Sequence, residues 1–509
     1  MDLYSTNKAE STSFVKRNNA SFLRREVAVR LVRAFFEGRL VEAANRIPYD
    51  MFPKDAEAQF RCCIYKERAI IRLRCLSALG FPVEEDDEFE PLSGYAQKAL
   101  EREKPELPVL TVVDVACKGC VKARYTVTEY CQGCLARPCV VNCAFGAVSF
   151  FNGKSHIDPV VCKNCGRCME SCPYGAIMKL HVPCEESCPT GAIHKTSEGR
   201  AEIDFEKCTA CGRCMRACPF GAIMERSQII DVARKLVDGS RPVVALIAPA
   251  IAGQFPHSVE KICGALLELG FSHVQSVAAG ADKTSATEAE EFIERIKRGE
   301  RFMTTSCCPA YVETAKKLVP ELLPFVSSTP TPMSYSAATA KKRYPDAVTV
   351  FIGPCVAKRV EGLRDPNVDY VLTFEELGSL FKAADLDVGK AKESALEYPA
   401  SAQGRGFPIT GGVADAVKTI VEAQVDMYPS LKGVEVKPIC VDGLSPTGIR
   451  TLKLYATKSC PGNLVEVMTC EGGCVGGAGA LGNPKVATRE IKKLVEKSPK
   501  LVDMESFED

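Results

Sequence analysis

Residues 162–177 read CKNCGRCMESCPYGAI, and residues 208–223 repeat the pattern as CTACGRCMRACPFGAI, 46 residues further along the chain. Each copy places three cysteines on a tight loop and a fourth directly before a proline, which prevents the loop from continuing as a helix. Three thiolates held close together can bind three corners of a 4Fe–4S cubane, while the fourth reaches a neighbouring cluster. A zinc site needs only four sulfurs from separated pairs. This spacing therefore favours iron–sulfur clusters over zinc.

The composition agrees with that interpretation. The 509 residues are 46% hydrophobic and 25% charged, with a net charge of +1, which predicts a soluble protein of two to four domains without a general attraction to nucleic acid or membrane. There are 27 cysteines against 5 histidines, and the polar N-terminus MDLYSTNKAE lacks an apolar signal core. Disulfides are an improbable use of so many thiols in such a chain. We therefore expect a cytoplasmic iron–sulfur protein from an anaerobic or low-oxygen cell.

Further cysteines precede and separate the two repeats. CQGCLARPCVVNC (131–143) is a variant in which Ala144 replaces the usual proline, and CKGC (117–120) and CEESCP (184–189) add two pairs. The sixteen thiols resemble those of the four-cluster, ferredoxin-like subunits of molybdopterin oxidoreductases. That resemblance implies four ligand groups: Cys131, Cys134, Cys139 and Cys172; Cys162, Cys165, Cys168 and Cys143; Cys208, Cys211, Cys214 and Cys188; Cys117, Cys120, Cys184 and Cys218. A zinc knuckle or spare surface thiols remain the alternative for Cys117, Cys120 and Cys184.

The rest of the chain divides into a helical and an α/β part. SFLRREVAVRLVRAFFEGRLVEAANRI (21–47) and FRCCIYKERAIIRLRCLSALG (60–80) have helical periodicity, and we expect the cysteines of the second helix to be buried small hydrophobes. From about residue 240, buried-strand candidates such as AVTVFIGPC (347–355) alternate with helices, which predicts a mainly parallel sheet. The expected regions are a helical one (1–108), a ferredoxin-like one (109–228) and a catalytic one (229–509).

Three cysteine signatures follow in the α/β part: TSCCPAY (305–311), GPCVAK (353–358) and EVMTCEGGCVGGAG (466–479). In this order they resemble the three signature segments of FeFe hydrogenases, and the resemblance runs from about residue 240 to 490. It implies an α/β catalytic domain with two parallel-sheet lobes around an H-cluster, beside an α+β ferredoxin-like domain. The H-cluster is a 4Fe–4S cubane joined through a cysteine sulfur to a two-iron unit bearing CO, CN⁻ and a bridging dithiolate amine.

The resemblance assigns roles to the cysteines of these signatures. Cys308, Cys355, Cys470 and Cys474 would hold the cubane, with Cys474 bridging to the two-iron unit. The adjacent Cys307 would be a free thiol, and a thiol titrating near pH 8.5 can carry protons around neutral pH. Lys358 resembles the lysine that donates to a cyanide, although it could also be a surface lysine after a strand.

The same resemblance predicts a proton route and a cavity wall. Glu288 and Glu291 lie in GADKTSATEAEEFIERI (280–296) and share a helix face as i and i+3 residues, unless that face is simply solvated. Ser327, in SSTPTPM (327–333), would complete the route. Phe407, Met468, Pro354, Ala250 and Met333 are expected to line the cofactor.

Several positions depart from prototypical members of the family. Met333 replaces a glutamine, Ala250 a serine, Gly353 a methionine and Tyr311 a tryptophan, and the last signature ends GGAGAL instead of GGGQP. The two-iron unit would have fewer side-chain donors, which changes its redox properties. These differences indicate a divergent group of the family.

The resulting hypothesis is an FeFe hydrogenase that interconverts H₂ with protons and electrons. It would exchange electrons with ferredoxin through two to four additional 4Fe–4S clusters, four being favoured by the thiol count, and would need maturation enzymes. One alternative is a hydrogenase-like iron–sulfur assembly protein, a class that characteristically lacks the cysteine at position 307. Another is a hydrogen sensor of low activity. No nucleotide-binding site is recognised in the sequence, so direct NAD(P)H oxidation is not expected.

Overall fold

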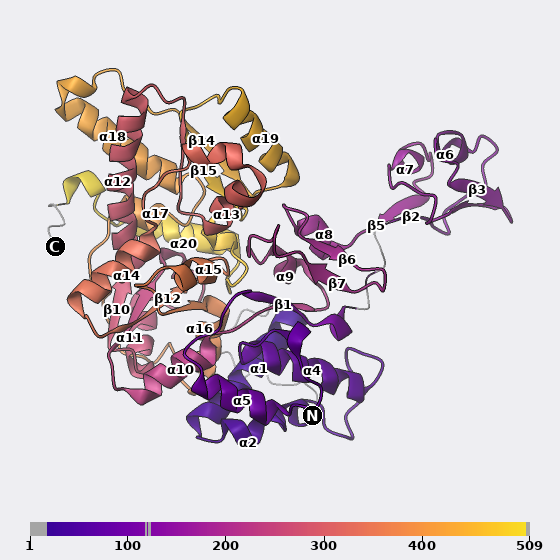
Figure 1. The fold of residues 1–509 in the computed structure, drawn as a ribbon, viewed down its shortest axis with the longest axis horizontal. Helices are drawn as coiled ribbons and strands as arrows, with labels where there is room; N and C mark the ends of the chain where they lie inside the picture. Colours follow the sequence, from indigo (N-terminus) through magenta and orange to yellow (C-terminus); the bar gives the residue numbers. More distant parts are fainter. Residues whose placement is uncertain (1–17, 118–119, 121–123, 505–509) are drawn as a thin grey trace.

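The structure is a computed structural model that describes residues 18–117, 120 and 124–504. The chain runs from a group of helices, through a cysteine-rich segment of short strand pairs, into a larger α/β body (Figure 1). Within the described ranges, no helix is long and apolar enough to cross a membrane.

The N-terminal helices are shorter than their periodicity suggests. The stretch 21–47 is not one helix: Gly38 takes a left-handed conformation (φ +69°) after the end of the first helix, and a second break follows at residues 45–46. The elements of this part are α1 (Asn19–Phe36), α2 (Leu40–Ala44), α3 (Ile47–Met51), α4 (Ile64–Ala78) and α5 (Leu92–Glu101).

The cysteines around α4 correct one expectation. Cys75 is buried within the helix, as predicted. Cys63 is the N-cap residue of α4 and Cys62 precedes it, so neither lies inside the helix; Cys62 is exposed and Cys63 half-buried. The prediction of buried thiols was wrong for this pair because helical periodicity does not mark where the first turn begins.

The cysteine-rich segment contains four short antiparallel strand pairs, each linking two strands of the segment. Its elements are β1 (Leu110–Val112), β2 (Arg124–Val127), α6 (Pro138–Val141), β3 (Val148–Phe151), β4 (Lys154–Ile157), α7 (Arg167–Glu170), β5 (Ile177–Leu180), α8 (Pro183–Ser187), β6 (Ile193–Lys195), β7 (Ala201–Ile203), α9 (Arg213–Ala217) and β8 (Ile223–Glu225). β1 pairs with β8, so the two ends of the segment meet.

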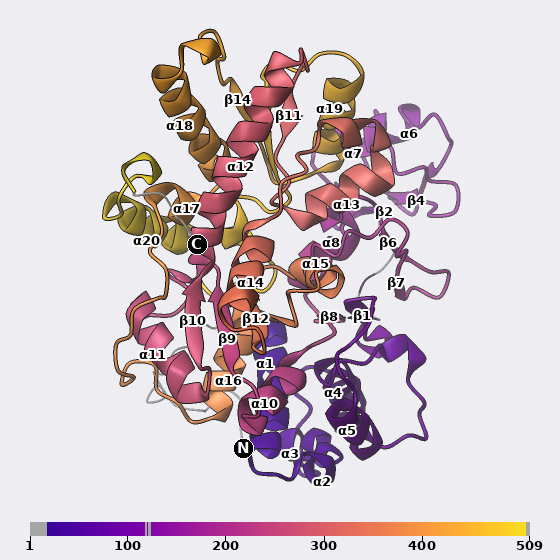
Figure 2. The same ribbon diagram turned by 60° about the vertical axis from the view of Figure 1, so that its left-hand side comes forward.

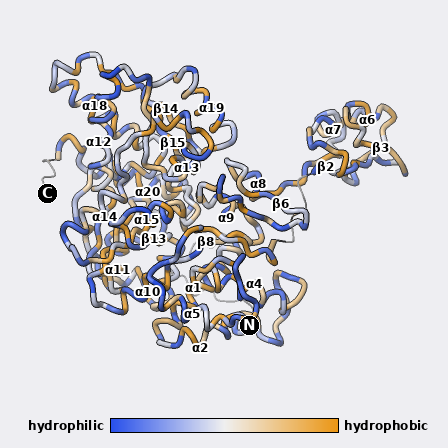
Figure 3. Tube along the Cα trace, viewed as in Figure 1, coloured by the Kyte–Doolittle hydropathy of each residue, from blue (hydrophilic) through white to orange (hydrophobic). Residues whose placement is uncertain are grey.

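Residues 124–180, which we call the arm, project away from the rest of the molecule (Figure 1). β2 and β5 pair at its base, with Arg124 opposite Leu180. Bulky apolar side chains such as those of Leu135, Val141 and Val160 are exposed on it, and Figure 3 shows hydrophobic stretches along its trace.

The larger of two parallel sheets has the strand order β10-β9-β12-β13. All five residues of β9 and all six of β12 are buried, as expected for strands covered on both faces. The strands are β9 (Val243–Ile247), β10 (His273–Ser276), β12 (Val348–Gly353) and β13 (Tyr370–Thr373). The predicted α/β architecture with parallel strands is thus confirmed.

A second parallel sheet has the order β11-β15-β14. Its strands are β11 (Met303–Thr304), β14 (Pro438–Asp442) and β15 (Leu464–Met468). The long helix α12 (Val277–Lys297) runs beside both sheets (Figures 1 and 2). The other helices of the body are α10 (Ile229–Asp238), α11 (Val259–Leu269), α13 (Pro309–Leu318), α14 (Pro332–Arg343), α15 (Lys358–Arg364), α16 (Phe374–Ala383), α17 (Ala402–Gly406), α18 (Gly412–Met427), α19 (Pro446–Thr457) and α20 (Pro484–Glu496).

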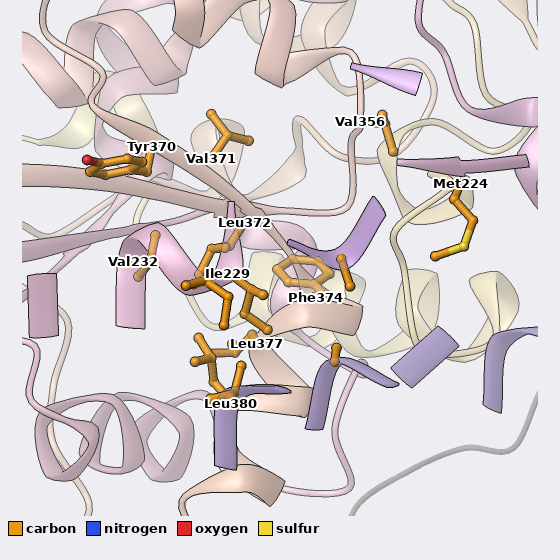
Figure 4. Packing of buried hydrophobic residues seen from close by; sticks show 14 of the residues in the cluster. Met224, Ile229, Val232, Val356, Tyr370, Val371, Leu372, Phe374, Leu377 and Leu380 are labelled. Atoms are coloured by element: carbon orange, nitrogen blue, oxygen red, sulfur yellow. The ribbon is translucent and has the colours of Figure 1, made fainter. Parts of the chain in front are cut away.

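The N-terminal helices and the α/β body share one hydrophobic core. Figure 4 shows a part of it in which Ile229 and Val232 of α10 pack with Leu372 of β13 and Leu377 of α16. Buried residues of α1 and α4, including Val27 and Leu76, belong to the same cluster. The N-terminal helices from α1 to α5 are therefore not a separately packed appendage.

A buried ionic network reinforces this junction. Arg359 of α15 is 1% exposed and donates to the main-chain oxygens of Arg226 (2.9 Å) and Val371 (3.3 Å). It also forms ion pairs with Glu376 and Glu225, the latter at 3.5 Å. Burial raises the pKa of Glu225 to about 7, so this carboxyl depends on the guanidinium beside it for its charge.

Replacing Arg359 with leucine should lower the free energy of unfolding by about 3–5 kcal/mol, because two buried carboxylates lose their cation. Arg364, at the other end of α15, is exposed and pairs with Glu313, so Arg364→Leu should cost less than about 1 kcal/mol. Denaturant unfolding of the full chain, followed by circular dichroism, measures both effects. Equal midpoints for the two variants would contradict the prediction.

Candidate metal centre

One cavity of about 100 Å³ lies where strands of both parallel sheets end. β9 leads into Ala248–Ala250, β12 into Pro354 and Cys355, and β15 into Thr469 and Cys470, all of which line the cavity. Ligand sites in open parallel sheets lie beyond the carboxyl ends of the strands. The topology therefore gathers loops that are distant in sequence around a single space.

The four cysteines expected to hold the cubane all line this cavity: Cys308, Cys355, Cys470 and Cys474. Cys308 is the N-cap residue of α13, and its thiol donates to the Thr469 hydroxyl at 3.5 Å. Burial, followed by the charges of neighbouring thiols, raises the pKa of Cys355 to about 11 and of Cys474 to about 12. Thiols in this environment become thiolates when a cation compensates their charge.

The arrangement fits a polynuclear group better than a single ion. Among the described residues, no three His, Cys, Asp or Glu side chains are placed to hold one metal ion. The four thiols line one cavity, and a 4Fe–4S cubane takes four cysteine sulfurs. The chemistry of an all-sulfur donor set agrees with iron–sulfur binding.

Glycines let the last signature approach the cavity closely. Gly473 has a φ of +89°, and a Cβ built on it would lie 2.6 Å from the main-chain oxygen of Pro408. A side chain at this position would therefore clash and strain the backbone. The turn between Cys470 and Cys474 depends on that freedom.

Cys307 also reaches the cavity, beside its neighbour Cys308. Burial, with a further contribution from the nearby Glu288, holds the pKa of the Cys307 thiol well above its ordinary value. The side chain is therefore a neutral thiol at neutral pH. Cys307 is thus a fifth, protonated thiol beside the four cysteines that are expected to hold the cubane.

Glu288 lies behind Cys307 on α12 and is completely buried. Its Oε1 accepts a hydrogen bond from the main-chain N–H of Ser306 (3.1 Å), while its Oε2 has no hydrogen-bond partner among the described residues. Burial raises the pKa of Glu288 to about 7. The alternative of a solvated face does not apply to this residue.

Glu291, one turn further along α12, has the opposite character. Burial works against its charge, but hydrogen bonds from Ser327 (2.7 Å) and Thr329 (3.0 Å), with the ion pair to Arg295 (2.7 Å), lower its pKa to about 2. The carboxylate is therefore permanently ionised near neutral pH. By accepting hydrogen bonds from Ser327 and Thr329, it holds the loop that carries Ser327 in place.

Lys358 lines the cavity, and only 9% of the residue is exposed. Burial opposes its charge, but Glu361, 2.7 Å from the ammonium, raises the pKa of Lys358 above its ordinary value. The hydroxyl of Thr331 takes a second N–H at 3.1 Å. An ammonium has three N–H donors, so one remains for the cavity.

The remaining expected wall residues surround the same space: Phe407, Met468, Pro354, Ala250 and Met333. The departures from prototypical members make this wall apolar, since Ala250 and Met333 bring no hydrogen-bond donor. Tyr311 lies outside the cavity lining, fully buried, with its hydroxyl 2.6 Å from that of Thr304.

Sequence reasoning missed three residues that support this site. Glu361 and Arg295 could have been found, because they lie three and four residues after Lys358 and Glu291 on the same helices. Thr331 had no such signal, since 27 residues separate it from Lys358.

The structure brings together the thiols of one expected group in the arm: Cys131, Cys134, Cys139 and Cys172 line a small pocket. In the other group, burial, and after it the thiols of Cys162 and Cys143, raise the pKa of Cys168. Cys165, the fourth expected member, is exposed.

The two other groups lie nearer the body. Burial and the thiols of Cys218 and Cys117 raise the pKa of Cys184 to about 12, and the same two neighbours act on Cys120. Burial likewise raises the pKa of Cys211 to about 12, with contributions from Cys188 and Cys208.

The group containing Cys211 adjoins the cavity. Cys211 is among the thiols that act on the pKa of the cavity ligand Cys470, after burial and the other cavity thiols. Arg213 donates to the main-chain oxygen of Leu444, and Arg216 to that of Gly476. The loop that carries this group is thus fastened to the loop that carries Cys470.

Comparison with known proteins agrees with this site. Residues 241–478 match the family model described as the iron only hydrogenase large subunit, C-terminal domain. Residues 154–177 match a 4Fe-4S binding domain, and residues 179–229 the LdpA Fe-S cluster-binding domain. The periplasmic [Fe] hydrogenase large subunit of Nitratidesulfovibrio vulgaris is 32% identical over 306 residues, which cover 50% of this chain and 72% of that relative. The chain belongs to the iron-only hydrogenase family.

This member of the iron-only hydrogenase family is also similar to other proteins over about half of its length. Iron hydrogenase 1 of Clostridium pasteurianum is 29% identical over 53% of this chain, which spans 55% of that relative. The cytosolic Fe-S cluster assembly factor narfl of Xenopus tropicalis is 24% identical over 47% of this chain and 60% of its own length. Among solved structures, a variant of the [FeFe]-hydrogenase HydA1 from Chlamydomonas reinhardtii has a TM-score of 0.42 at 23% identity, covering 50% of this chain and 84% of that one.

Proposed function

We propose that this chain is an FeFe hydrogenase that catalyses 2H⁺ + 2e⁻ ⇌ H₂. The observation that carries the proposal is the set of five thiols lining one cavity. Four of them match the ligand set implied for the H-cluster, and the fifth, of Cys307, is spare. An H-cluster bound there would supply the redox chemistry of the reaction.

The residues of the chain would hold and orient that cofactor. Cys308, Cys355 and Cys470 would bind the cubane, and Cys474 would bridge to the two-iron unit. The N–H of Lys358 that neither Glu361 nor Thr331 takes would donate to a cyanide. The apolar wall would exclude water from the reacting face.

Protons would reach the cavity through Glu288 and Cys307. The buried Glu288, with a pKa of about 7, can both take and release a proton near neutral pH. Glu291 would keep Ser327 in position through its fixed charge, and Ser327 would link Glu288 to the surface.

Electrons would pass through four 4Fe–4S clusters between a ferredoxin and the cavity. The hydrogen bonds from Arg213 to Thr469 and from Arg216 to Gly476, which join the Cys211 loop to the loop that carries Cys470, support a path that ends at the cubane. In this proposal the chain consists of a helical region (1–108), a ferredoxin-like region (109–228) that carries the electrons and a catalytic region (229–509). We further propose a cytoplasmic location and dependence on maturation enzymes.

A hydrogenase-like assembly protein is the second candidate, because narfl is named as an assembly factor and matches 47% of this chain. Proteins of that class bind only cubanes and characteristically lack the cysteine at position 307. The presence of Cys307 in the cavity lining favours the hydrogenase. A hydrogen sensor of low activity would use the same cavity.

Infrared spectroscopy of the matured protein distinguishes these candidates. We expect CO and CN⁻ bands, together with roughly 22 irons per chain on the four-cluster count. Absence of the bands after competent maturation would favour the assembly protein. An iron content near 14 would reduce the accessory clusters to two.

A further inference from the structure

The group formed by Cys117, Cys120, Cys184 and Cys218 lies at the base of the arm. Cys120 precedes β2 and Cys184 follows β5, the two strands that close the arm. Burial and nearby thiols, including that of Cys184, raise the pKa of Cys214 in the next group well above its ordinary value. The order of the groups is therefore arm, base of the arm, Cys211 group, cavity.

The base group is more enclosed than either group in the arm. Three of its four cysteines are buried, Cys117, Cys184 and Cys218, whereas each group in the arm has one buried cysteine, Cys139 or Cys168. The N-terminal helices contribute to the enclosure, since Arg74 of α4 donates to the main-chain oxygen of Phe220 (3.1 Å) in the turn after Cys218. A charge in this group is therefore poorly screened by solvent.

Lys195, the last residue of β6, points its ammonium at this group. Its Nζ lies 2.9 Å from the Sγ of Cys117, 3.2 Å from the main-chain oxygen of Cys117 and 2.9 Å from that of Gly199. All three N–H donors are thus used, and one of them is directed at a ligand sulfur.

No other cluster group receives such a donor in the part of the chain that the structure describes. The sulfurs of Cys143, Cys162, Cys188 and Cys208 accept from main-chain N–H groups, and Cys139 and Cys188 contact hydroxyls. Among the described cysteines of these groups, Cys117 alone has a side-chain ammonium at hydrogen-bond distance from its sulfur. The carboxylate of Glu185 lies nearby but is hydrogen-bonded to the main-chain N–H of Lys195 (2.8 Å).

We infer that Lys195 raises the reduction potential of the base cluster above those of the two clusters in the arm. Reduction adds a negative charge to a cluster and its thiolates, and an ammonium bonded to a ligand sulfur stabilises that charge. The effect is large where solvent screens little. Of these three clusters, the one at the base of the arm would then be reduced most readily, next to the group that adjoins the cavity. This inference rests on the proposed clusters alone and does not require H₂ chemistry.

A redox titration of the full chain, followed by electron paramagnetic resonance, tests the inference. The protein is produced without H-cluster maturation, so that only 4Fe–4S signals contribute and a failure of the hydrogenase proposal has no influence. In Lys195→Met, one cluster should shift to a more negative potential while the others stay unchanged. Lys195→Arg, which keeps the charge, should stay close to the native value, and Lys195→Gln should shift less than Lys195→Met.

The matched control is Lys154→Met. Lys154 acts on the pKa of Cys131 in the arm, but its ammonium is paired with Glu129 and donates to no sulfur, so all potentials should stay native. Unchanged potentials in Lys195→Met, or an equal shift of all clusters, would overturn the inference. Loss of four irons in both Lys195→Met and Lys195→Gln would overturn it as well, because Lys195 would then be needed for cluster binding.

Discussion

Replacing Cys307 with alanine should lower the rate of H₂ turnover by at least about 100-fold, the usual contribution of a positioned proton donor. Cys307 is the spare thiol of the cavity, and burial keeps it protonated. Alanine leaves the four ligand cysteines untouched but cannot carry a proton. The CO and CN⁻ infrared bands of the matured protein should therefore remain while hydrogen evolution and oxidation are lost.

The control for this experiment is Cys440→Ala. Cys440 lies on β14, next to the strand that leads to Met468, yet it is exposed and outside the cavity lining. Its removal should leave both turnover and bands unchanged. Native turnover in Cys307→Ala would exclude this thiol as the proton carrier, and loss of the bands would give it a structural role instead.

Glu288→Gln should reduce turnover by a similar factor, at least about 100-fold. The amide oxygen can still accept from the main-chain N–H of Ser306, so the local geometry is kept while the titrating proton is lost. In the native protein, hydrogen evolution should fall as the pH rises through about 7, because the buried carboxyl then becomes ionised. The variant should lose this limb of the pH profile.

Glu290→Gln is the matched control, since Glu290 is exposed on the same helix. It should retain the native rate and the native pH profile. A native rate in Glu288→Gln, or a profile that still breaks near pH 7, would show that protons take another route. Glu288→Asp should recover part of the activity, which a purely structural role would not require.

Glu288→Gln should also change how the stability of the folded protein depends on pH. The pKa of Glu288 is about 7 in the folded protein and close to 4.5 in the unfolded chain, so the folded state binds more protons between these values. Its stability should therefore fall by about 3 kcal/mol as the pH rises from 4.5 to beyond 7. Glu288→Gln removes that loss, and its melting temperature should compare more favourably with the native one at pH 8 than at pH 5.

The family and its cysteine motifs were accessible from the sequence because ligand spacing is local. Cys470 and Cys474 are four residues apart, and the two copies of the cluster motif are near repeats. The helical periodicity of residues 280–296 was similarly local, and it placed Glu288 and Glu291 on one helix, α12. It could not reveal that the pKa of Glu288 is raised by burial while that of Glu291 is lowered by hydrogen bonds that outweigh its burial, since each shift depends on residues from other loops.

Contacts between segments that are distant in the sequence could not be predicted from it. Arg24 of α1 donates to Glu375 at the start of α16, 351 residues later. No sequence motif around either residue predicts this contact. Lys195 and Cys117 are 78 residues apart. Such pairs arise from how the core closes, which composition and periodicity leave undetermined.

The way the arm is attached has a consequence for how this molecule can be remodelled. Because Arg124 and Leu180 face each other across one strand pair, cutting the chain there leaves two ends that a short turn could rejoin. The arm is therefore an insertion between two paired strands. In the proposed hydrogenase it could be shortened or exchanged to suit a new electron donor without changing the residues that line the cavity.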